Sequence, residues 1–461
     1  MAELIRAAGI SGASRAPQAS CAALTALTAC TALLGGCGHP GPQIETVRFW
    51  AMGREAEKVV QLLPDFERLH PQIHIEVQQL AWTAAHEKLL TAIAGDATPD
   101  ICQLGNTWIP ELVALHAIQP LQTWVTASQV VARDDYFPGV WQTNILDNVL
   151  YGVPWYVDTR LLYYRSDLLR AAGFDAPAQT WDEWRRQLQA IKHLVGPEHY
   201  AVLLPLNEFE PLQVMAYEQP EPMLREGNRY GNFRSASFRR ALGFYHDLFA
   251  QSLAPPKTNT QISNVWNELG NGYFAFYISG PWNIAEFKRR LPPAQQGSWM
   301  TAPMPGPDGP GVSSVGGASL AIFNRSQHKS SAWALIEYLA QPAVQRRFYE
   351  LTGDLPTRRS SWLVGAIATD PYTRAFRAQL ERLRAFPQVP EWEQIMQAMS
   401  VMSERVVHGD QTVDQAVIAL DAEVDAMLAK RRWMLDRQAK LSATHPAELP
   451  PGLPAKAATM P

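Results

Sequence analysis

Carboxylate, guanidinium, amide and indole side chains follow several segments that are predicted to be strands. Arg54 and Glu55 stand at the start of the first predicted helix, and Asn106 and Trp108 come directly after the third predicted strand. In open α/β sheets, strand ends and helix starts meet at a cleft. Charged and amide groups hydrogen-bond to hydroxyls, and tryptophan offers a flat apolar face. These residues predict a site for a hydroxyl-rich ligand, although a solvated helix end would also explain Arg54 and Glu55.

Further candidates follow later predicted strands. Trp82 comes after the second strand and could stack on a ligand, but core packing explains it nearly as well. Tyr156 and Asp158 end an apolar run at 151–158, where a carboxylate has no packing role, so we expect both at the ligand. Arg160 could instead pair with Asp158 as part of the structure.

The elements that must position these side chains alternate between strand and helix. β-rich runs at 46–50 and 73–77 flank an apolar pattern of helical period, which Pro64 should kink. A helix at 83–94 and a strand at 100–104 follow. Such alternation predicts an α/β fold with a mainly parallel sheet that is covered by helices.

The rest of the chain repeats these patterns. Helices are predicted at 181–194, 237–250, 331–338, 391–407 and 412–435, and strands at 272–280 and 316–323. The proline- and glycine-rich run 302–310 reads as a connector. The region 436–461 becomes rich in alanine and proline, which predicts a partly disordered tail.

Length, charge and cysteine usage limit the possible classes of protein. The chain has 461 residues, more than one hydrophobic core usually serves, which predicts two lobes. Its formal net charge of −4 lacks the basic surplus of a nucleic-acid-binding protein. Cys102 lies in an apolar run, so we expect a buried thiol. His70 and His74 lack the spacing of a helical zinc pair, and no P-loop is present, so we expect neither metal nor cofactor.

The N-terminal region predicts export. Cys37 follows Leu-Gly-Gly at the end of an apolar run that comes after Arg6 and Arg15, the anatomy of a secretory signal peptide. These four residues resemble the bacterial lipobox, which implies a signal peptide over 1–36 and a lipid on Cys37. The protein would then lie in the periplasm or at the outer face of the cytoplasmic membrane. A buried helix, or a signal peptide cut elsewhere, is the alternative.

Five stretches, in their order and spacing, resemble the extracellular solute-binding proteins of ATP-binding-cassette sugar importers, of the maltose, trehalose and multiple-sugar type. They lie at 49–55, 97–101, 151–165, 171–184 and 272–282, and the short runs 303–305, 316–317 and 352–356 follow. The resemblance implies a two-lobed periplasmic-binding-protein fold with discontinuous lobes, a hinge and an interlobe cleft. Lobe one would comprise 44–157 plus 306–354, and lobe two 158–305 plus 355–435.

The resemblance also implies a receptor without catalysis, which captures a neutral oligosaccharide (maltose, maltodextrin or trehalose) by hinge closure and delivers it to a transmembrane permease. Trp282 would face the sugar. Gly316 and Gly317 would let the backbone approach it, although Ala318 follows where disaccharide-binding relatives carry an aromatic residue. Arg358 would reach back to a hydroxyl, with a surface charge pair as the alternative. We expect a monomer whose lipid anchor touches the membrane.

Some candidates and one other class of protein remain open at this point. Glu208 and Glu210 could line the second lobe, but an exposed loop explains them better, and Trp392 is a weaker candidate. Arg359, like its neighbour Arg358, could reach a ligand hydroxyl or form a surface charge pair. A secreted glycosidase would need two carboxylates at a separation fixed by its mechanism, and no pair of acids stands out in the sequence.

Overall fold

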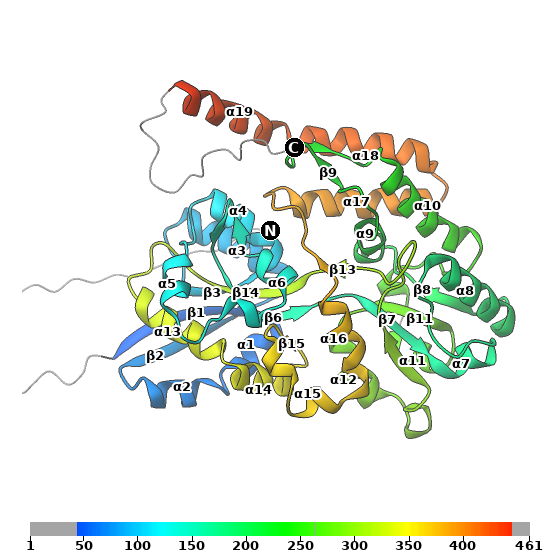
Figure 1. Ribbon diagram of the computed structural model, residues 1–461, viewed down its shortest axis with the longest axis horizontal. Coiled ribbons are helices and arrows are strands. Elements are labelled where there is room, and N and C mark those ends of the chain that lie inside the picture. The colour runs from blue at the N-terminus through cyan, green and yellow to red at the C-terminus, as the bar shows by residue number, and fades with distance from the viewer. Residues whose placement is uncertain (1–43, 263, 445–461) are drawn as a thin grey trace, which may run out of the picture. The chain divides into compact units, whose positions relative to one another are not determined.

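The computed structural model describes residues 44–262 and 264–444. The predicted signal peptide and the lipid site at Cys37 lie outside these residues. The described chain contains two main β-sheets, each covered by helices (Figure 1). The α/β class and the division into two lobes, both predicted from the sequence, are confirmed, whereas the lobe boundaries remain a prediction.

The larger sheet has six strands in the order β15-β6-β14-β3-β1-β2. They are β1 (Glu45–Met52), β2 (Ile73–Leu80), β3 (Ile101–Gly105), β6 (Val153–Asp158), β14 (Gly316–Ile322) and β15 (Leu355–Pro356). β1 is parallel to β2 and β3, but β14 is antiparallel to β3 and β6, and β15 is antiparallel to β6. The prediction of a mainly parallel sheet is therefore wrong. Strand-helix alternation sets the direction of consecutive strands, whereas β14 and β15 return from distant parts of the chain.

Six helices of the described chain lie in the segments that connect the strands of the larger sheet. They are α1 (Gly53–Val59), α2 (Leu63–Leu69), α3 (Trp82–Ala94), α4 (Ile109–Ala114), α13 (Lys329–Leu339) and α14 (Pro342–Thr352). α1 and α2 replace the single kinked helix predicted across Pro64. That proline lies in the first turn of α2, where its missing N–H costs no helical hydrogen bond. Phe49, Phe66 and Trp155 are among the buried side chains that hold these helices to the sheet.

The smaller sheet has the strand order β12-β7-β11-β8. Its strands are β7 (Leu161–Arg165), β8 (Tyr200–Leu203), β11 (Phe274–Ser279) and β12 (Trp299–Ala302). All six residues of the inner strand β11 are buried, as expected for a strand that is covered on both faces. β7 follows β6 of the larger sheet after only Thr159 and Arg160, so the chain crosses between the sheets beside Asp158.

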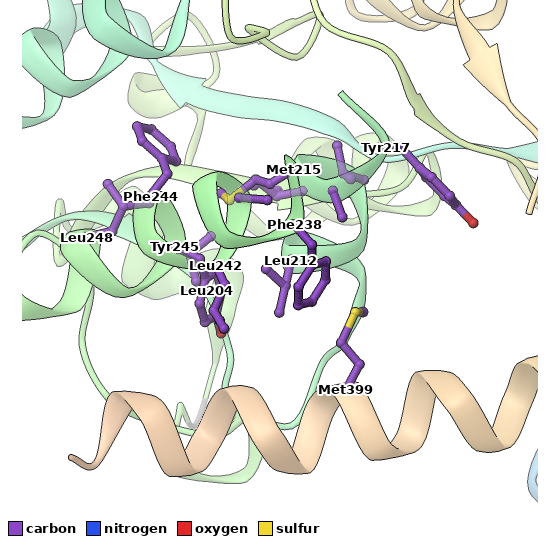
Figure 2. Close-up of a cluster of buried hydrophobic side chains, with 14 of the residues drawn as sticks. Leu204, Leu212, Met215, Tyr217, Phe238, Leu242, Phe244, Tyr245, Leu248 and Met399 are labelled. Carbon is purple, nitrogen blue, oxygen red and sulfur yellow. The ribbon is translucent and has the colours of Figure 1, made fainter. Parts of the chain in front are cut away.

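Several long helices belong to the part of the chain that holds the smaller sheet. They are α8 (Trp181–Val195), α9 (Glu210–Tyr217), α10 (Ala236–Ala250), α17 (Trp392–Val407) and α18 (Val413–Met427). A capping box between Thr180 and Glu183 fixes the start of α8. Figure 2 shows apolar side chains of α9 and α10 gathered near Met399 of α17. This packing ties helices that are far apart in the sequence into one core.

The shorter elements connect these layers. They are α5 (Gln122–Ala127), α6 (Pro138–Gln142), α7 (Ser166–Ala171), α11 (Val265–Gly270), α12 (Trp282–Arg290), α15 (Ala366–Thr369), α16 (Arg374–Leu380), β4 (Ile145–Leu146), β5 (Val149–Leu150), β9 (Leu224–Arg225), β10 (Tyr230–Gly231), β13 (Ser313–Ser314) and β16 (Leu383–Arg384). Among the helices of 44–262 and 264–444, none is long and apolar enough to cross a membrane.

The last described helix differs from its prediction. The helix expected at 412–435 is interrupted at Leu428, and α19 (Ala429–Thr444) follows. α19 includes residues 436–444, for which the sequence predicts partial disorder. Arginine, lysine, glutamine, leucine and alanine predominate there and favour a helix, and Asp436 forms an ion pair with Arg229. The remainder of the predicted tail lies outside the described residues.

Candidate functional site

A cavity of about 200 Å³ lies between the carboxyl end of β3, the start of β14 and the helices α9 and α17. Its aromatic lining consists of Trp82, Trp108, Phe209, Tyr217, Phe386 and Trp392, and its polar side chains are Asn106, Thr107, Asp158, Arg160, Glu210, Gln213, Ser314 and Glu393. Gly316 and Gly317 complete the wall beside β14. The structure thus brings together six of the residues predicted from the sequence: Trp82, Asn106, Trp108, Asp158, Gly316 and Gly317.

Two indoles form one corner of this cavity. Trp82 opens α3, and Trp108 follows β3; their ring centroids lie 5.6 Å apart in an edge-to-face arrangement. Trp108 is nearly buried, whereas Trp82 remains 37 % exposed. Asn106, beside them, donates from Nδ2 to the Gly316 carbonyl over 3.1 Å. The buried ring holds the exposed ring in place, so Trp82 can present an apolar face to a ligand.

Charged side chains form a chain of ion pairs at the crossing between the sheets. Arg160 donates to Asp158 Oδ1 over 3.0 Å and to Glu210 Oε1 over 2.5 Å. Its guanidinium carbon also lies 4.8 Å from the centre of the Trp282 ring. Burial raises the pKa of Asp158, while Arg160 opposes this shift. The structural pairing of Asp158 with Arg160, raised as an alternative from the sequence, is therefore present.

Gly316 and Gly317 are required by strand packing. Gly316 lies opposite Asp158, and a Cβ there would come 2.0 Å from Asp158 Oδ1. Gly317 has a φ of +98°, and a Cβ would come 2.4 Å from the Tyr156 carbonyl oxygen. The two glycines thus let β14 approach β6 closely beside Asp158, and they also line the cavity.

A pair of carboxyl groups, half-buried Glu55 and buried Asp354, lies beside the Trp82 corner. Trp82 Nε1 donates to Glu55 Oε2 over 3.3 Å. Burial and then the charge of Glu55 raise the pKa of Asp354 to about 8, and burial also raises the pKa of Glu55. Arg54 is exposed and reaches the Leu351 carbonyl over 3.4 Å. None of Arg54, Glu55 and Asp354 lines the cavity, but Glu55 supports Trp82, which does.

Tyr156 and Trp282 occupy positions that differ from those expected. Tyr156 is buried in the core of the larger sheet, where its hydroxyl accepts a hydrogen bond from Gln103 Nε2 over 2.9 Å. Trp282 is exposed and lies over Arg160. Neither side chain lines the cavity. Tyr156 therefore acts as a packing residue in this structure, and Trp282 contacts Arg160, which lines the cavity.

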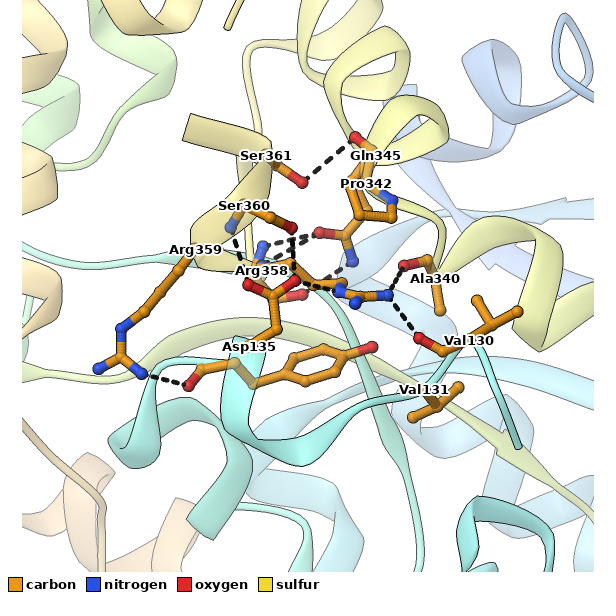
Figure 3. A network of polar contacts seen from close by, with 12 residues as sticks. Val130, Val131, Asp135, Ala340, Pro342, Gln345, Arg358, Arg359, Ser360 and Ser361 are labelled. Atoms are coloured by element: carbon orange, nitrogen blue, oxygen red, sulfur yellow. Dashed lines mark hydrogen bonds and ion pairs between the residues drawn. The ribbon is translucent and has the colours of Figure 1, made fainter. Parts of the chain in front are cut away.

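Arg358 is held in a polar network that does not line the cavity (Figure 3). Its Nε donates to Asp135 Oδ2 over 2.7 Å, and one terminal nitrogen donates to the carbonyls of Val130 and Ala340 over 2.6 and 3.1 Å. The buried guanidinium therefore has its partners within the fold, contrary to the expectation that it reaches a ligand. Both arginines thus form the charge pairs that the sequence left open as the alternative, Arg358 with Asp135 and Arg359 with Glu381 over 2.7 Å.

Helices α9 and α17 supply cavity residues that the sequence interpretation missed or ranked low. Glu210, Gln213 and Tyr217 are spaced along one face of α9, and Glu210 belongs to this helix, not to the exposed loop that was preferred for it. Trp392 opens α17 and is fully buried, and its indole N–H has no hydrogen-bond partner among the described residues. The i, i+3, i+7 spacing of Glu210, Gln213 and Tyr217 could have indicated a shared binding face on α9, but the same spacing is also typical of core packing.

The arrangement suits binding of a ligand that has both apolar faces and hydroxyl groups. Indole and phenyl rings can stack on such faces, and carboxylate, amide and guanidinium groups can bond hydroxyls. The charged lining has three acids, Asp158, Glu210 and Glu393, against the single Arg160. Over residues 44–262 and 264–444, no group of three or more His, Cys, Asp or Glu side chains is arranged to hold a metal ion.

Known proteins share this fold. The family model described as bacterial extracellular solute-binding protein matches residues 53–346. The sugar-binding protein MalE of Xanthomonas citri is 56 % identical; the match covers 85 % of this chain and 99 % of that chain, with a TM-score of 0.83. An ABC transporter solute-binding protein of Thermotoga lettingae, bound to α-D-tagatose, is 25 % identical over 83 % of this chain and 100 % of its own, with a TM-score of 0.71. The diacetylchitobiose-binding protein DasA of Streptomyces coelicolor is 23 % identical over 76 % of this chain and 81 % of its own.

Proposed function

Since this chain belongs to the bacterial extracellular solute-binding proteins, we propose that it captures a neutral oligosaccharide for an ATP-binding-cassette importer. Maltose, a short maltodextrin or trehalose is the expected ligand. The similarity to the sugar-binding protein MalE of Xanthomonas citri supports a sugar. The protein acts as a receptor, not as an enzyme, and passes its ligand to a transmembrane permease.

The observation that carries this proposal is the composition of the cavity walls. Trp82 and Trp108 follow strands β2 and β3 of the larger sheet, whereas Tyr217 and Trp392 come from helices of the other lobe. A sugar ring between them has aromatic groups available on both sides. Because the ligand would then contact both lobes, it favours a closed arrangement over an open one, which is how a ligand drives hinge closure.

The charged groups of the cavity support a neutral ligand. Asp158 and Glu210 share Arg160, and Glu393 adds a further carboxylate. An anionic ligand would meet this acidic excess, which costs binding free energy in a partly dehydrated site. Hydroxyl groups, in contrast, can donate to the carboxylates and accept from Asn106 or Gln213.

Isothermal titration calorimetry tests the ligand class. We expect saturable binding of maltose, maltotriose or trehalose, and no binding of glycerol phosphate or amino acids. Trp108→Ala should weaken affinity at least about tenfold, equivalent to about 1.4 kcal/mol, because it removes one ring and the support of Trp82. Trp433→Ala, an exposed tryptophan outside the cavity, is the matched control and should leave affinity unchanged. Steady release of cleaved sugar would contradict the receptor proposal.

We also propose that a lipid on Cys37 holds the receptor at the outer face of the cytoplasmic membrane. This proposal is supported by the resemblance of Leu34-Gly35-Gly36-Cys37 to the bacterial lipobox. Growth with a radioactive fatty acid should label the native protein and not Cys37→Ser. Equal labelling of both would refute the anchor and leave the sugar-binding proposal untouched.

A further inference from the structure

The outer side of α19 combines exposed apolar and basic side chains. Trp433 is 59 % exposed and Met434 is 52 % exposed, although both are large apolar residues. Lys430 and Arg437 are exposed beside them. Lys430 lies three and four positions before Trp433 and Met434, and Arg437 lies four positions after Trp433, so the helix brings the four side chains to one side. These four residues are called the α19 patch below.

The opposite side of α19 is attached to the β9–β10 hairpin. The guanidinium of Arg432 lies 4.6 Å from the centre of the Tyr230 ring and donates to the Arg229 carbonyl over 3.0 Å. Asp436, at the edge of the patch, forms an ion pair with Arg229. The hairpin therefore fixes which side of α19 faces outward, and Arg229 neutralises the charge of Asp436.

The local charge of this helix is opposite to that of the whole chain. The sequence from 429 to 440 has five basic residues and only one acid, Asp436, whereas the chain carries a formal net charge of −4. Clusters of basic residues are attracted to anionic lipid surfaces, and tryptophan is enriched at the membrane–water interface. The indole and the methionine side chain can enter the interface while the cations remain among the phosphates.

We propose that the α19 patch docks this chain on the surface of an anionic lipid bilayer. The size of the patch favours a lipid over a protein partner, because stable protein interfaces use about 20–30 residues a side with complementary shape. A fluid headgroup layer needs no complementary shape and supplies the negative charge. Arg437 lies 5.4 Å from the centre of the Trp433 ring, so a cation and an aromatic group can reach the same headgroup layer together. This inference is independent of what the cavity binds.

Co-sedimentation with lipid vesicles tests the proposal. The chain from Ile44 to Pro461 is suitable because it forms a compact unit of its own and lacks the apolar N-terminal run and Cys37. It should sediment with vesicles of phosphatidylglycerol and phosphatidylcholine in equal parts, and not with vesicles of phosphatidylcholine alone. Added salt should weaken the binding, because it screens exposed charges.

Two double variants separate the apolar and the electrostatic contributions. Lys430→Gln with Arg437→Gln should lower partition onto the anionic vesicles roughly twenty-fold, about fivefold for each cation. Trp433→Ser with Met434→Ser should lower it at least about tenfold. Arg133→Gln with Arg234→Gln, at two exposed arginines elsewhere, and Leu363→Ser, at a residue that is 72 % exposed, are the matched controls and should bind as the parent chain does.

Three outcomes would overturn the proposal. The first is absence of binding to the anionic vesicles, and the second is equal binding by the parent and both patch variants. The third is concentration-dependent self-association of the parent, seen by light scattering without vesicle binding and lost in the patch variants. That result would identify the patch as a contact between copies of this chain. Circular dichroism of each variant verifies that α19 substitutions leave the fold intact.

Discussion

The buried carboxyl group of Asp354 should make the protein less stable as the pH rises, and Asp354→Asn should remove most of that dependence. The residue is 9 % exposed. Burial and the charge of the neighbouring Glu55 raise its pKa from the ordinary value of 3.8 to about 8. Asparagine has nearly the same shape and carries no charge, so the substitution removes the titration without opening a cavity.

The sign follows from proton binding. Between a pH of about 4 and about 8, the folded chain keeps a proton on Asp354 that the unfolded chain has released. The folded state binds more protons, so the free energy of unfolding falls as the pH rises, by about 1.4 kcal/mol per pH unit for one proton. Between about pH 6 and about pH 8 the loss is on the order of 2 kcal/mol, and above the folded pKa it levels off.

Guanidinium unfolding at a series of pH values measures this difference. The gap in unfolding free energy between Asp354→Asn and the parent should widen in favour of the variant from about pH 6 to about pH 8. Asp65→Asn is the matched control, since Asp65 is an exposed carboxylate that pairs with Arg68, and its gap should not widen. Parallel curves for the parent and Asp354→Asn would show that this carboxyl is ionised in the folded state, and the reasoning would fail.

Three further variants test other parts of the structure. Gly317→Ala should destabilise the fold by about 3 kcal/mol in chemical unfolding, because the residue has a positive φ and a Cβ there would clash with β6. Gly173 has a similar φ of +92° but open space around it, so Gly173→Ala should cost only about 1 kcal/mol. Arg160→Met should cost about 3 kcal/mol by leaving two carboxylates unpaired, and adding Glu210→Gln should restore part of that stability. Arg358→Ala should lower the melting temperature by several degrees without changing sugar affinity in calorimetry. A weaker affinity with an unchanged melting temperature would instead show that Arg358 contacts the ligand.

Local patterns predicted the elements of the fold well but not all of their directions. The runs at 46–50 and 73–77 lie within β1 and β2, and the parallel pairing of these strands follows from the helical segment between them. The place of β14 between β3 and β6 depends on where the chain returns after the second lobe. A short-range pattern carries no information about that return.

The site was predictable where residues follow strands. Trp82, Asn106 and Asp158 line the cavity because strand ends of one sheet lie close together. The acidic partner of Arg358 could not be predicted, because Asp135 lies 223 positions earlier and no local pattern joins the two. Trp392 was ranked low for a similar reason, since only the folded chain shows which wall of the cavity α17 supplies.

The central position of β14 also has a consequence for when the protein can fold. Until residue 322 has been synthesised, β3 and β6 have no strand between them, and the larger sheet remains in two unconnected pieces. The last wall of the cavity arrives later still, with α17 at Trp392–Val407. Pairing of strands that are far apart in sequence is slow. The larger sheet of a growing chain therefore stays incomplete for most of its synthesis, and an incomplete sheet is easier to thread through a narrow channel than a finished one.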